Sequence, residues 1–422
     1  MKFLENINLI IGIFFILCYA YQAFYILVPF IKKPKAHKKT VFHDIGILIS
    51  ARNEADVIGQ LLDSIAQQDY PADRLRVFLV ADNCTDETAH IARQKGAIVY
   101  ERFNTKKVGK GYALSYLLSH IDRDFGLKTI DAFIVLDADN VLEPNYVTEM
   151  NKTYCDGYRI TTSYRNSKNY AANWISAGYA LWFLREAKYL NNSRMLLGTS
   201  CAVSGTGFLF AREILEERHG WNYHLLTEDI EFTCDSIVRG ERIGYCADAV
   251  LYDEQPVTFR QSWNQRMRWA KGFLQVMRKH GKSLFKGIFS KNFSSCFDMF
   301  MTISPAYSIV TVSIGLNILG IFFGLMGDLN IDHLLRGLAQ NLVVGYVMLF
   351  LAGIITTVTE WKSIHCPRSK KILYAFTFPF FMFTYIPISV AVFFKKVEWS
   401  PIKHSHSFTV EQIKQGSKAV SK

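Results

Sequence analysis

Four long stretches of this sequence contain no charged residue. Each is longer than the roughly 20 apolar residues that a helix needs to cross about 30 Å of hydrocarbon. The block between the first two, Lys32–Asp298, has mixed polarity, and at 50% hydrophobic the whole chain is too apolar to be disordered. The sequence therefore predicts one water-exposed domain placed between membrane segments. The four stretches are Asn6–Ile31, Met299–Gly327, Gly337–Thr359 and Ile372–Phe394.

Basic residues gather where the apolar stretches meet the block between them. The net charge is +11, and lysines are concentrated in Lys32–Lys39, with a second basic cluster in Arg260–Lys291. Positive charge beside membrane segments is typical of their cytosolic ends and of contact with anionic head groups, rather than of nucleic-acid binding. A cleaved signal peptide would have a shorter apolar run, with the basic residues before it. We therefore expect a multi-pass protein of the cell membrane, partnered by the lipid bilayer, with its N-terminus outside and its large domain in the cytosol.

The last apolar stretch does not fit this alternation. If Ile372–Phe394 crossed the membrane, the basic tail from Lys395 would lie outside, against the charge rule. Pro379 and Pro387 would allow a broken or re-entrant segment, provided that protein covers the freed backbone groups. We therefore expect the tail to be cytosolic.

Short apolar runs alternate with helical patterns in the first part of the large domain. This alternation predicts an α/β fold with a mainly parallel sheet that helices cover on both faces. In such sheets ligands bind outside the carboxyl ends of the strands. The expected strands are Ile45–Ser50, Leu75–Ala81, Ala97–Tyr100 and Ala132–Leu136, and the expected helices are Glu54–Gln67, Thr85–Lys95 and Gly111–His120.

Carboxylates follow three of these strands. Glu54 comes after the first, Asp82 and Asp86 after the second, and Asp137-Ala-Asp139 after the fourth. Taken singly they are weak signals, because an Asp can cap a helix and a D-x-D can be a solvated turn. Two carboxylates at one sheet edge repel each other unless a cation neutralises them, and magnesium often takes one or two carboxylates together with substrate phosphates. We therefore expect a metal–diphosphate site at this edge.

Glycine-rich phosphate loops do not compete with this interpretation. The segment Val108–Tyr112 has neither the G-x-G-x-x-G nor the Walker spacing, which disfavours a dehydrogenase or an ATPase. Downstream, Thr227-Glu-Asp229 could be a helix cap with an acidic first turn, or could position a carboxylate for proton abstraction. Gln265-Arg-Met-Arg-Trp269 could be an interfacial helix, or could bind phosphate through arginine and a sugar ring through tryptophan.

In this order, from Ile45 to Trp269, these motifs resemble those of the membrane-embedded processive glycosyltransferases of family 2, which include cellulose, chitin and hyaluronan synthases. The resemblance implies a GT-A fold and a nucleotide-activated sugar, usually linked to UDP. It implies that Asp139 ligates Mg2+ or Mn2+ with support from Asp137, that Asp229 beside Glu228 is the general base, and that Trp269 is a platform for the acceptor. The implied donor-binding residues are Ala51, Glu54, Asp82 (on uracil), Lys110, Asp137, Gln265 and Arg268, and the implied acceptor pocket includes Gly205 and Thr206.

The product stays open at this level. A single span before the domain and no appended regulatory domain leave open whether a long polymer is built. The alternatives are transfer of one sugar to a lipid acceptor and, more remotely, an inactive nucleotide-sugar-binding or transport scaffold. Neither the donor sugar nor the oligomeric state follows from the motifs.

The chain divides into five expected parts. Its eight cysteines include no C-x-x-C pair, which indicates reduced, mostly buried thiols rather than a zinc ribbon. The parts are an N-terminal span with its basic flank (1–40), a GT-A domain (41–255), interfacial helices (256–297), a membrane region (298–395) and a basic tail (396–422).

Overall fold

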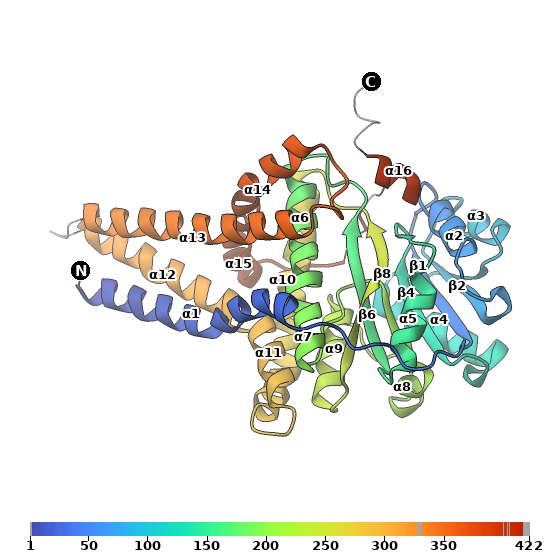
Figure 1. The fold of residues 1–422 in the computed structure, drawn as a ribbon. Coiled ribbons are helices and arrows are strands. Elements are labelled where there is room, and N and C mark those ends of the chain that lie inside the picture. The colour runs from blue at the N-terminus through green and yellow to red at the C-terminus, as the bar shows by residue number, and fades with distance from the viewer. Residues whose placement is uncertain (1, 327–330, 400, 403, 405, 417–422) are drawn as a thin grey trace.

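An eight-stranded sheet lies at the centre of the domain, with the strand order β3-β2-β1-β4-β7-β6-β8-β5 (Figure 1). The computed structural model describes residues 2–326, 331–399, 401–402, 404 and 406–416. All four predicted strands are present, each within two residues of its expected ends. The strands are β1 Ile45–Ala51, β2 Leu75–Asp82, β3 Ile98–Arg102, β4 Ala132–Asp137, β5 Val141–Leu142, β6 Ile160–Ser167, β7 Phe208–Ala211 and β8 Ile243–Asp253.

The sheet is parallel only in part. The strands β3, β2, β1 and β4 pair in parallel, as predicted, and so do β6 and β8. In contrast, β7 pairs antiparallel with both β4 and β6, and β5 pairs antiparallel with β8. The α/β class is therefore confirmed. The expectation of a mainly parallel sheet holds for the half made of β3, β2, β1 and β4, whereas the sheet as a whole is mixed.

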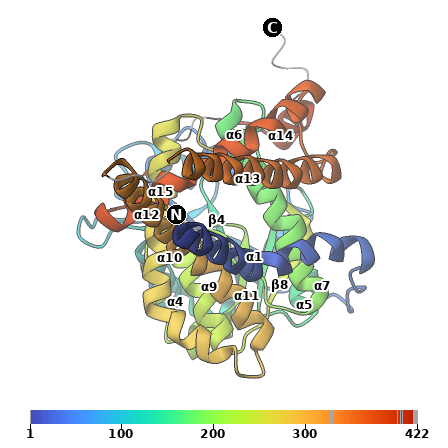
Figure 2. The same cartoon turned by 90° about the vertical axis from the view of Figure 1, so that its left-hand side faces the viewer.

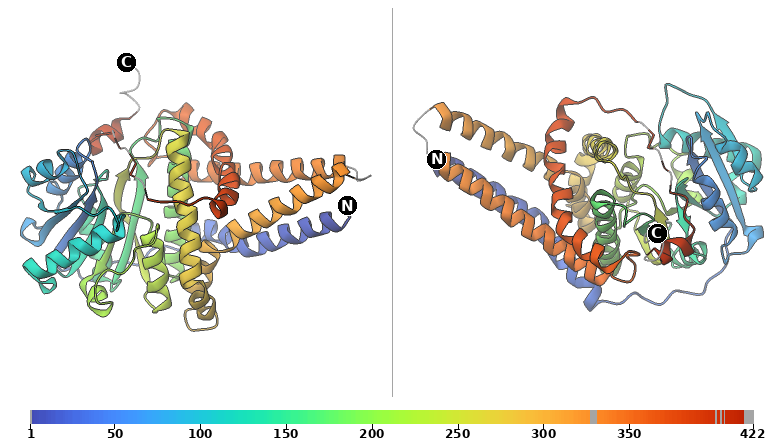
Figure 3. Two further views of the ribbon diagram at one scale, coloured as in Figure 1. Left: turned by 180° about the vertical axis from the view of Figure 1, so that it is seen from behind. Right: turned by 90° about the horizontal axis from the view of Figure 1, so that it is seen from above.

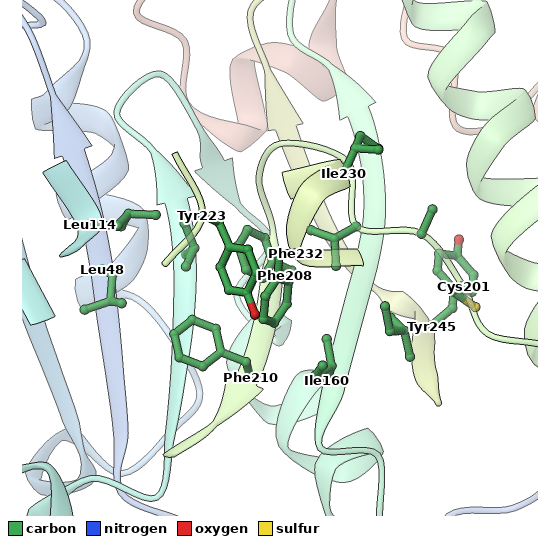
Figure 4. Close-up of a cluster of buried hydrophobic side chains, with 14 of the residues drawn as sticks. Leu48, Leu114, Ile160, Cys201, Phe208, Phe210, Tyr223, Ile230, Phe232 and Tyr245 are labelled. Carbon is green, nitrogen blue, oxygen red and sulfur yellow. The ribbon is translucent and has the colours of Figure 1, made fainter. Parts of the chain in front are cut away.

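Helices cover both faces of the sheet, and each face has its own apolar core. The helices α2 (Ile58–Ala66), α3 (Thr88–Gln94) and α5 (Tyr146–Cys155) pack on one face. The helices α4 (Lys110–Phe125), α6 (Trp174–Arg185) and α9 (Glu228–Val238) contribute to the larger core on the other face. Figure 4 shows the aromatic centre of that larger core, where Phe208, Phe210 and Phe232 pack together. The short helices α7 (Asn192–Leu197) and α8 (Arg212–Glu217) follow α6 and β7.

Three long helices, α1 (Lys2–Ile31), α12 (Pro305–Met326) and α13 (Ile331–Thr359), project from one side of the domain (Figure 1). Figure 2 looks at this side, with the three helices in front of α6, α10 and the sheet. Asn8 of α1 and Asn317 of α12 join the first two through a side-chain hydrogen bond of 3.0 Å. By length and composition, the described segments that could cross a membrane are Asn8–Ile31, Leu335–Thr359 and Arg368–Phe394.

The last of these segments is broken, as the prolines suggested. It consists of α14 (Arg368–Phe383) and α15 (Tyr385–Phe394), which lie across the base of the projecting helices (Figures 1 and 3). At the break, the buried Arg266 side chain donates hydrogen bonds to the Phe381 carbonyl, at 3.2 Å, and to the Thr384 hydroxyl. The Phe381 carbonyl also accepts the Thr384 amide, at 3.2 Å, so α10 adds a further donor at the break and ties the two helices to the domain.

Arg266 belongs to α10 (Phe259–Gly287), a long helix that also lies at this base and continues into α11 (Phe293–Ile303). After α15 the chain returns to the sheet and ends its described part in α16 (Val410–Gln415). The tail therefore lies on the same side of the projecting helices as the sheet. All eight cysteines are free thiols, and most are buried, in agreement with the expectation of reduced cysteines.

Candidate active site

A cavity opens at the edge of the sheet where β1, β2 and β4 end. In the strand register Ser50 of β1 lies beside Asp137 of β4, and Ala51 lies beside Ala81 of β2. The loops that follow these strands therefore meet at one level. Nearly all the site residues expected from the sequence line this one cavity: Ala51, Glu54, Asp82, Lys110, Asp137, Asp139, Gly205, Glu228, Asp229, Gln265, Arg268 and Trp269.

Asp82 is held at the end of β2 by a buried ion pair. The residue is 4% exposed, and its Oδ1 accepts a hydrogen bond from Arg102 at 2.5 Å. Burial raises the pKa of Asp82, and the Arg102 guanidinium opposes that shift. The pair keeps the carboxylate in one orientation toward the cavity. Asp86, the other candidate for a cap, does bond the start of α3, because its Oδ1 accepts from the Thr88 amide at 3.1 Å.

Asp137 and Asp139 differ in their hydrogen bonding. The ammonium of Lys110 donates to Asp137 and, at 2.8 Å, to the Gly205 carbonyl. Asp139 accepts the Glu254 amide on Oδ2 at 2.8 Å, and its Oδ1 accepts no hydrogen bond from the described residues. One Asp139 oxygen is thus available at the cavity wall.

Asp137 and Asp139 fit a hard divalent ion whose remaining ligands come from the phosphates of a bound substrate. Among the described residues no group of three or more His, Cys, Asp or Glu side chains could enclose a metal by itself. Magnesium commonly uses one or two carboxylates and completes its shell with substrate phosphates and water. The buried Lys168 ammonium, which interacts electrostatically with Asp139, has no hydrogen-bond partner in the described part of the chain, and burial lowers its pKa. The residues present therefore suit an ion that arrives with a diphosphate.

Glu228 and Asp229 form the first turn of α9, directly at the cavity. Thr227 is the residue before the helix, but its side chain makes no capping hydrogen bond, so the interpretation of Thr227 as a cap is wrong. Burial, together with the neighbouring Asp229, raises the pKa of Glu228 to about 7. Burial also raises the pKa of Asp229, against the opposing effect of Lys110 and Arg268. A carboxylate with a raised pKa in a cavity is suited to accept a proton near neutral pH.

The helix α10 presents Gln265, Arg268 and Trp269 to the cavity, because residues three and four apart lie on one helical face. The Gln265 Oε1 atom is buried and has no partner among the described residues, which leaves it available to a ligand. The Trp269 ring meets the rings of Tyr179 and Phe183 edge-on, at centroid distances of 5.6 and 6.1 Å. The indole is therefore fixed from the α6 side.

The two residues expected in an acceptor pocket are separated by the structure. Gly205 lines the cavity in the left-handed backbone region, with φ of 77°. Thr206 does not line it. Its buried hydroxyl donates to Asn140 Oδ1 at 2.5 Å and accepts from the Asp137 amide at 2.9 Å. Thr206 therefore stabilises the turn after β4, and we do not include it in the acceptor site.

Arg165 lines the cavity but was not predicted from the sequence. It lies near the end of β6, donates to the Asp253 carboxylate and to the Ser204 carbonyl, and stacks over Phe183 with its guanidinium carbon 3.8 Å from the ring centre. No local sequence motif indicates a role for Arg165, because only the order of strands in the sheet brings β6 next to the other residues that line the cavity.

The C-terminal tail also contributes to the cavity. Trp399, Ile402 and His404 line it, together with Pro401. His404 Nδ1 lies 3.0 Å from both carboxylate oxygens of Glu54, a contact between residues 350 positions apart. Although burial alone would lower it, the pKa of His404 is raised to about 10 by the Asp139 and Glu54 carboxylates.

Two further contacts hold the tail on the domain. His406 Nδ1 lies 2.8 Å from Glu254 Oε1, and Val410 and Ile413 of α16 pack on Val141 and Tyr252. The sequence gives no signal for the place of this part of the tail, because short irregular segments carry no periodicity.

A family model described as glycosyltransferase like family 2 matches residues 43–272. The probable glycosyltransferase YdaM of Bacillus subtilis is 26% identical over 344 residues, which cover 76% of this chain and 75% of that protein. A beta-monoglucosyldiacylglycerol synthase of Synechocystis is 26% identical over 244 residues, covering 56% of this chain and 48% of that enzyme. A poly-beta-1,6-N-acetyl-D-glucosamine synthase of Staphylococcus aureus is 24% identical over 247 residues, covering 57% of each. The last two matches therefore span only about half of each relative.

Among solved structures, a mannosyltransferase of Pyrobaculum calidifontis, PcManGT, in complex with GDP-Man and Mn2+, superposes with a TM-score of 0.59. The superposition covers 92% of this chain and 98% of that one, at 17% identity. Identity this low supports the fold alone: a GT-A-like mixed sheet combined with long apolar helices.

Proposed function

This chain belongs to glycosyltransferase-like family 2 and is a glycosyltransferase of the hexosyltransferase type, and from this premise we propose that it transfers a sugar from a UDP-sugar to a growing β-linked glycan at a membrane. One observation carries the proposal. The strand-end carboxylates Asp137 and Asp139, the half-buried Asp229 and the α10 residues Arg268 and Trp269 face the same cavity. Donor and acceptor groups would thus meet at a single site.

The chemistry would be one in-line displacement at the anomeric carbon. Asp229 would accept the proton of the attacking acceptor hydroxyl, for which its raised pKa is suited. Arg268, Gln265 and Lys110 would hold the departing diphosphate. Asp139, with Asp137, would hold Mg2+ or Mn2+, which would supply further neutralisation of the leaving charge. A single displacement inverts the configuration, so an α-linked donor would yield a β-linkage.

The acceptor would lie against Trp269. Its ring is fixed by Tyr179 and Phe183, and an aromatic face suits the apolar face of a sugar ring. The Q-x-x-R-W motif favours a processive polymer product, and one similar protein is named a poly-beta-1,6-N-acetyl-D-glucosamine synthase.

A second candidate is transfer of one sugar to a lipid. The observation that favours it is the comparable similarity to a beta-monoglucosyldiacylglycerol synthase. The sizes of the products separate the candidates: a ladder of chain lengths supports the polymer, and one discrete glycolipid supports single transfer.

For the membrane, we propose that α1 and α13 cross and that α12 crosses with them, because it projects beside α1 and is joined to it by the Asn8–Asn317 hydrogen bond. The segment Arg368–Phe394 is long enough to cross, but α14 and α15 lie across the base of these helices, so we propose that they lie at the interface. This arrangement leaves the sheet and the tail together in the cytosol, consistent with the lysines that follow α1. It also agrees with the tail contacts, since His404 and His406 both reach the domain.

The decisive experiment offers membranes that contain the protein a panel of UDP-sugars with Mg2+ or Mn2+. UDP release and product size are followed together, with and without EDTA. The proposal expects one preferred donor, release that depends on the divalent ion, and a sized glycan product. Undiminished turnover under EDTA would contradict the metal assignment, and UDP release from no sugar tested would contradict the proposed donor.

A further inference from the structure

The C-terminal half of α10 presents a basic and aromatic face that the active site does not use. Arg278, Lys282 and Lys286 follow one another at helical spacing on this face and are exposed. Phe285 lies on the same face and Phe289 lies just beyond the end of the helix, with 51% and 80% of their surfaces exposed. None of the three cations forms an ion pair within the part of the chain that the structure describes.

This face is continuous with the helices of the membrane region. The Phe285 ring lies 5.5 Å from Phe289 and 5.7 Å from Phe300 of α11. On α11, Phe297 in turn lies 5.5 Å from Tyr21 of α1. The hairpin between α10 and α11 therefore extends sideways from the base of the projecting helices, at the bottom of Figure 1.

We infer that Lys282 and Lys286 of α10, with the exposed Phe289 and Lys291 at its end, form a binding site for anionic phospholipid head groups at the bilayer surface. Lysines beside the base of membrane helices attract anionic head groups, and exposed phenylalanines between them enter the boundary of head groups and acyl chains. Lys291 and Phe293, which is 55% exposed, extend the same chemistry into the hairpin. The phenylalanines could also insert into a zwitterionic bilayer, but the lysines would find no net negative charge there.

The same helix joins this lipid site to the active site. Arg268 and Lys286 lie on one uninterrupted helix, about 27 Å apart along its axis at 1.5 Å per residue. Lipid bound at one end would therefore orient the residues that hold the diphosphate at the other. This coupling, unlike the lipid binding itself, rests on the proposed function.

The test uses the full chain in nanodiscs of phosphatidylcholine with or without phosphatidylglycerol. Phe289→Trp reports contact through quenching by brominated lipid, after subtraction of the signal of the seven native tryptophans. We expect about twofold stronger quenching by brominated phosphatidylglycerol than by brominated phosphatidylcholine at equal mole fraction. Phe103→Trp, at a 71% exposed position beyond β3, is the matched control and should show no quenching.

The charge variants then separate the site from general membrane contact. Lys282→Glu with Lys286→Glu should abolish the preference for phosphatidylglycerol, whereas Lys128→Glu, at an exposed position in the turn before β4, should retain it. If the double Glu variant does not assemble, Lys282→Gln with Lys286→Gln replaces it and should bring the twofold preference down to about one, that is, to equal quenching by both lipids. Equal quenching by both lipids with the native lysines, an unchanged preference in the variants, or displacement by soluble inorganic phosphate would overturn the inference.

Turnover gives the second readout. UDP release should rise several-fold with phosphatidylglycerol in the wild type and not in the lysine variants. No release from any UDP-sugar would count against the proposed function alone, because the quenching experiment does not depend on turnover.

Discussion

The two walls of the cavity are built in different ways. One wall consists of strand ends, where Asp82 and Asp139 are 4% and 5% exposed and the backbone continues into the two main cores. The other wall is the tail, which His404 and His406 hold through carboxylate contacts and which α16 anchors through a small separate cluster. Because that cluster belongs to neither main core, we expect the tail to separate from the cavity more readily than the sheet unfolds. The comparison suggests that fixed carboxylates do the chemistry and that a detachable wall controls access.

The largest effect should come from removing both strand-end carboxylates. We expect Asp137→Ala with Asp139→Ala to lower the transfer rate about 10⁴-fold, because the leaving diphosphate would lose its metal-held counter-charge. Turnover with saturating Mn2+ and a titration of Mn2+ binding measure it. Lys168→Gln, also buried near these carboxylates, controls for a general disturbance and should keep binding the ion. If the double variant kept its activity, Asp137 and Asp139 would not be required for transfer, and the strand-end wall would not be the catalytic one.

Asp229→Asn should come next, with a loss of about 10³-fold, since general bases typically contribute about 10²–10⁴-fold. Calorimetry should show nearly unchanged UDP affinity, and a clear loss of affinity would instead make Asp229 a binding residue. In the wild type, activity should fall as the pH falls through the pKa of Asp229, because protonation removes the base. Burial raises this pKa, so the acid limb should lie above the ordinary range of an aspartate and should be absent in Asp229→Asn.

Trp269→Ala tests the acceptor side of the fixed wall. We expect elongation to fall about tenfold while hydrolysis of the donor changes little, because in the proposed arrangement the indole would contact the acceptor rather than the nucleotide. Product sizing and UDP release measure the two activities side by side. Trp269→Phe should recover part of the elongation. Equal losses in both activities would remove the platform role.

What could be predicted from the sequence follows the same division. Buried strands such as Ala132–Asp137 carry a strong apolar signal, and the carboxylates that follow them were therefore found. Arg165 and the antiparallel pairs of β7 were missed, because the sheet order β4-β7-β6-β8 depends on long-range pairing. The place of His404 was missed for the same reason, since its partner Glu54 lies 350 positions away. Thr206 was assigned to the acceptor because a motif specifies its position in the chain but not the direction of its side chain.

His404→Ala sharpens the idea of a detachable wall. The variant loses the contact that ties the tail to Glu54, so we expect the KM for the UDP-sugar to rise about tenfold, with kcat changed by less than about threefold. His406→Ala is the matched control, because His406 contacts Glu254 but does not line the cavity, and its KM should change less. A fall in KM for His404→Ala would instead show that the imidazole competes with the donor for this position.

The smallest effect should come from the anchor of the tail. Ile413 is 4% exposed and packs in a cluster with Val141, Tyr252 and Val410, separate from both main cores. Ile413→Ala should therefore increase hydrogen exchange in the described residues of the tail and raise the KM for the donor about twofold. The free energy of global unfolding should change by no more than about 1 kcal/mol, which is less than a truncation in a main core costs. Ile413→Val, which keeps most of the packing, should behave like the wild type. If exchange rose throughout the sheet, the two walls would belong to one cooperative unit, and access would require more than release of the tail.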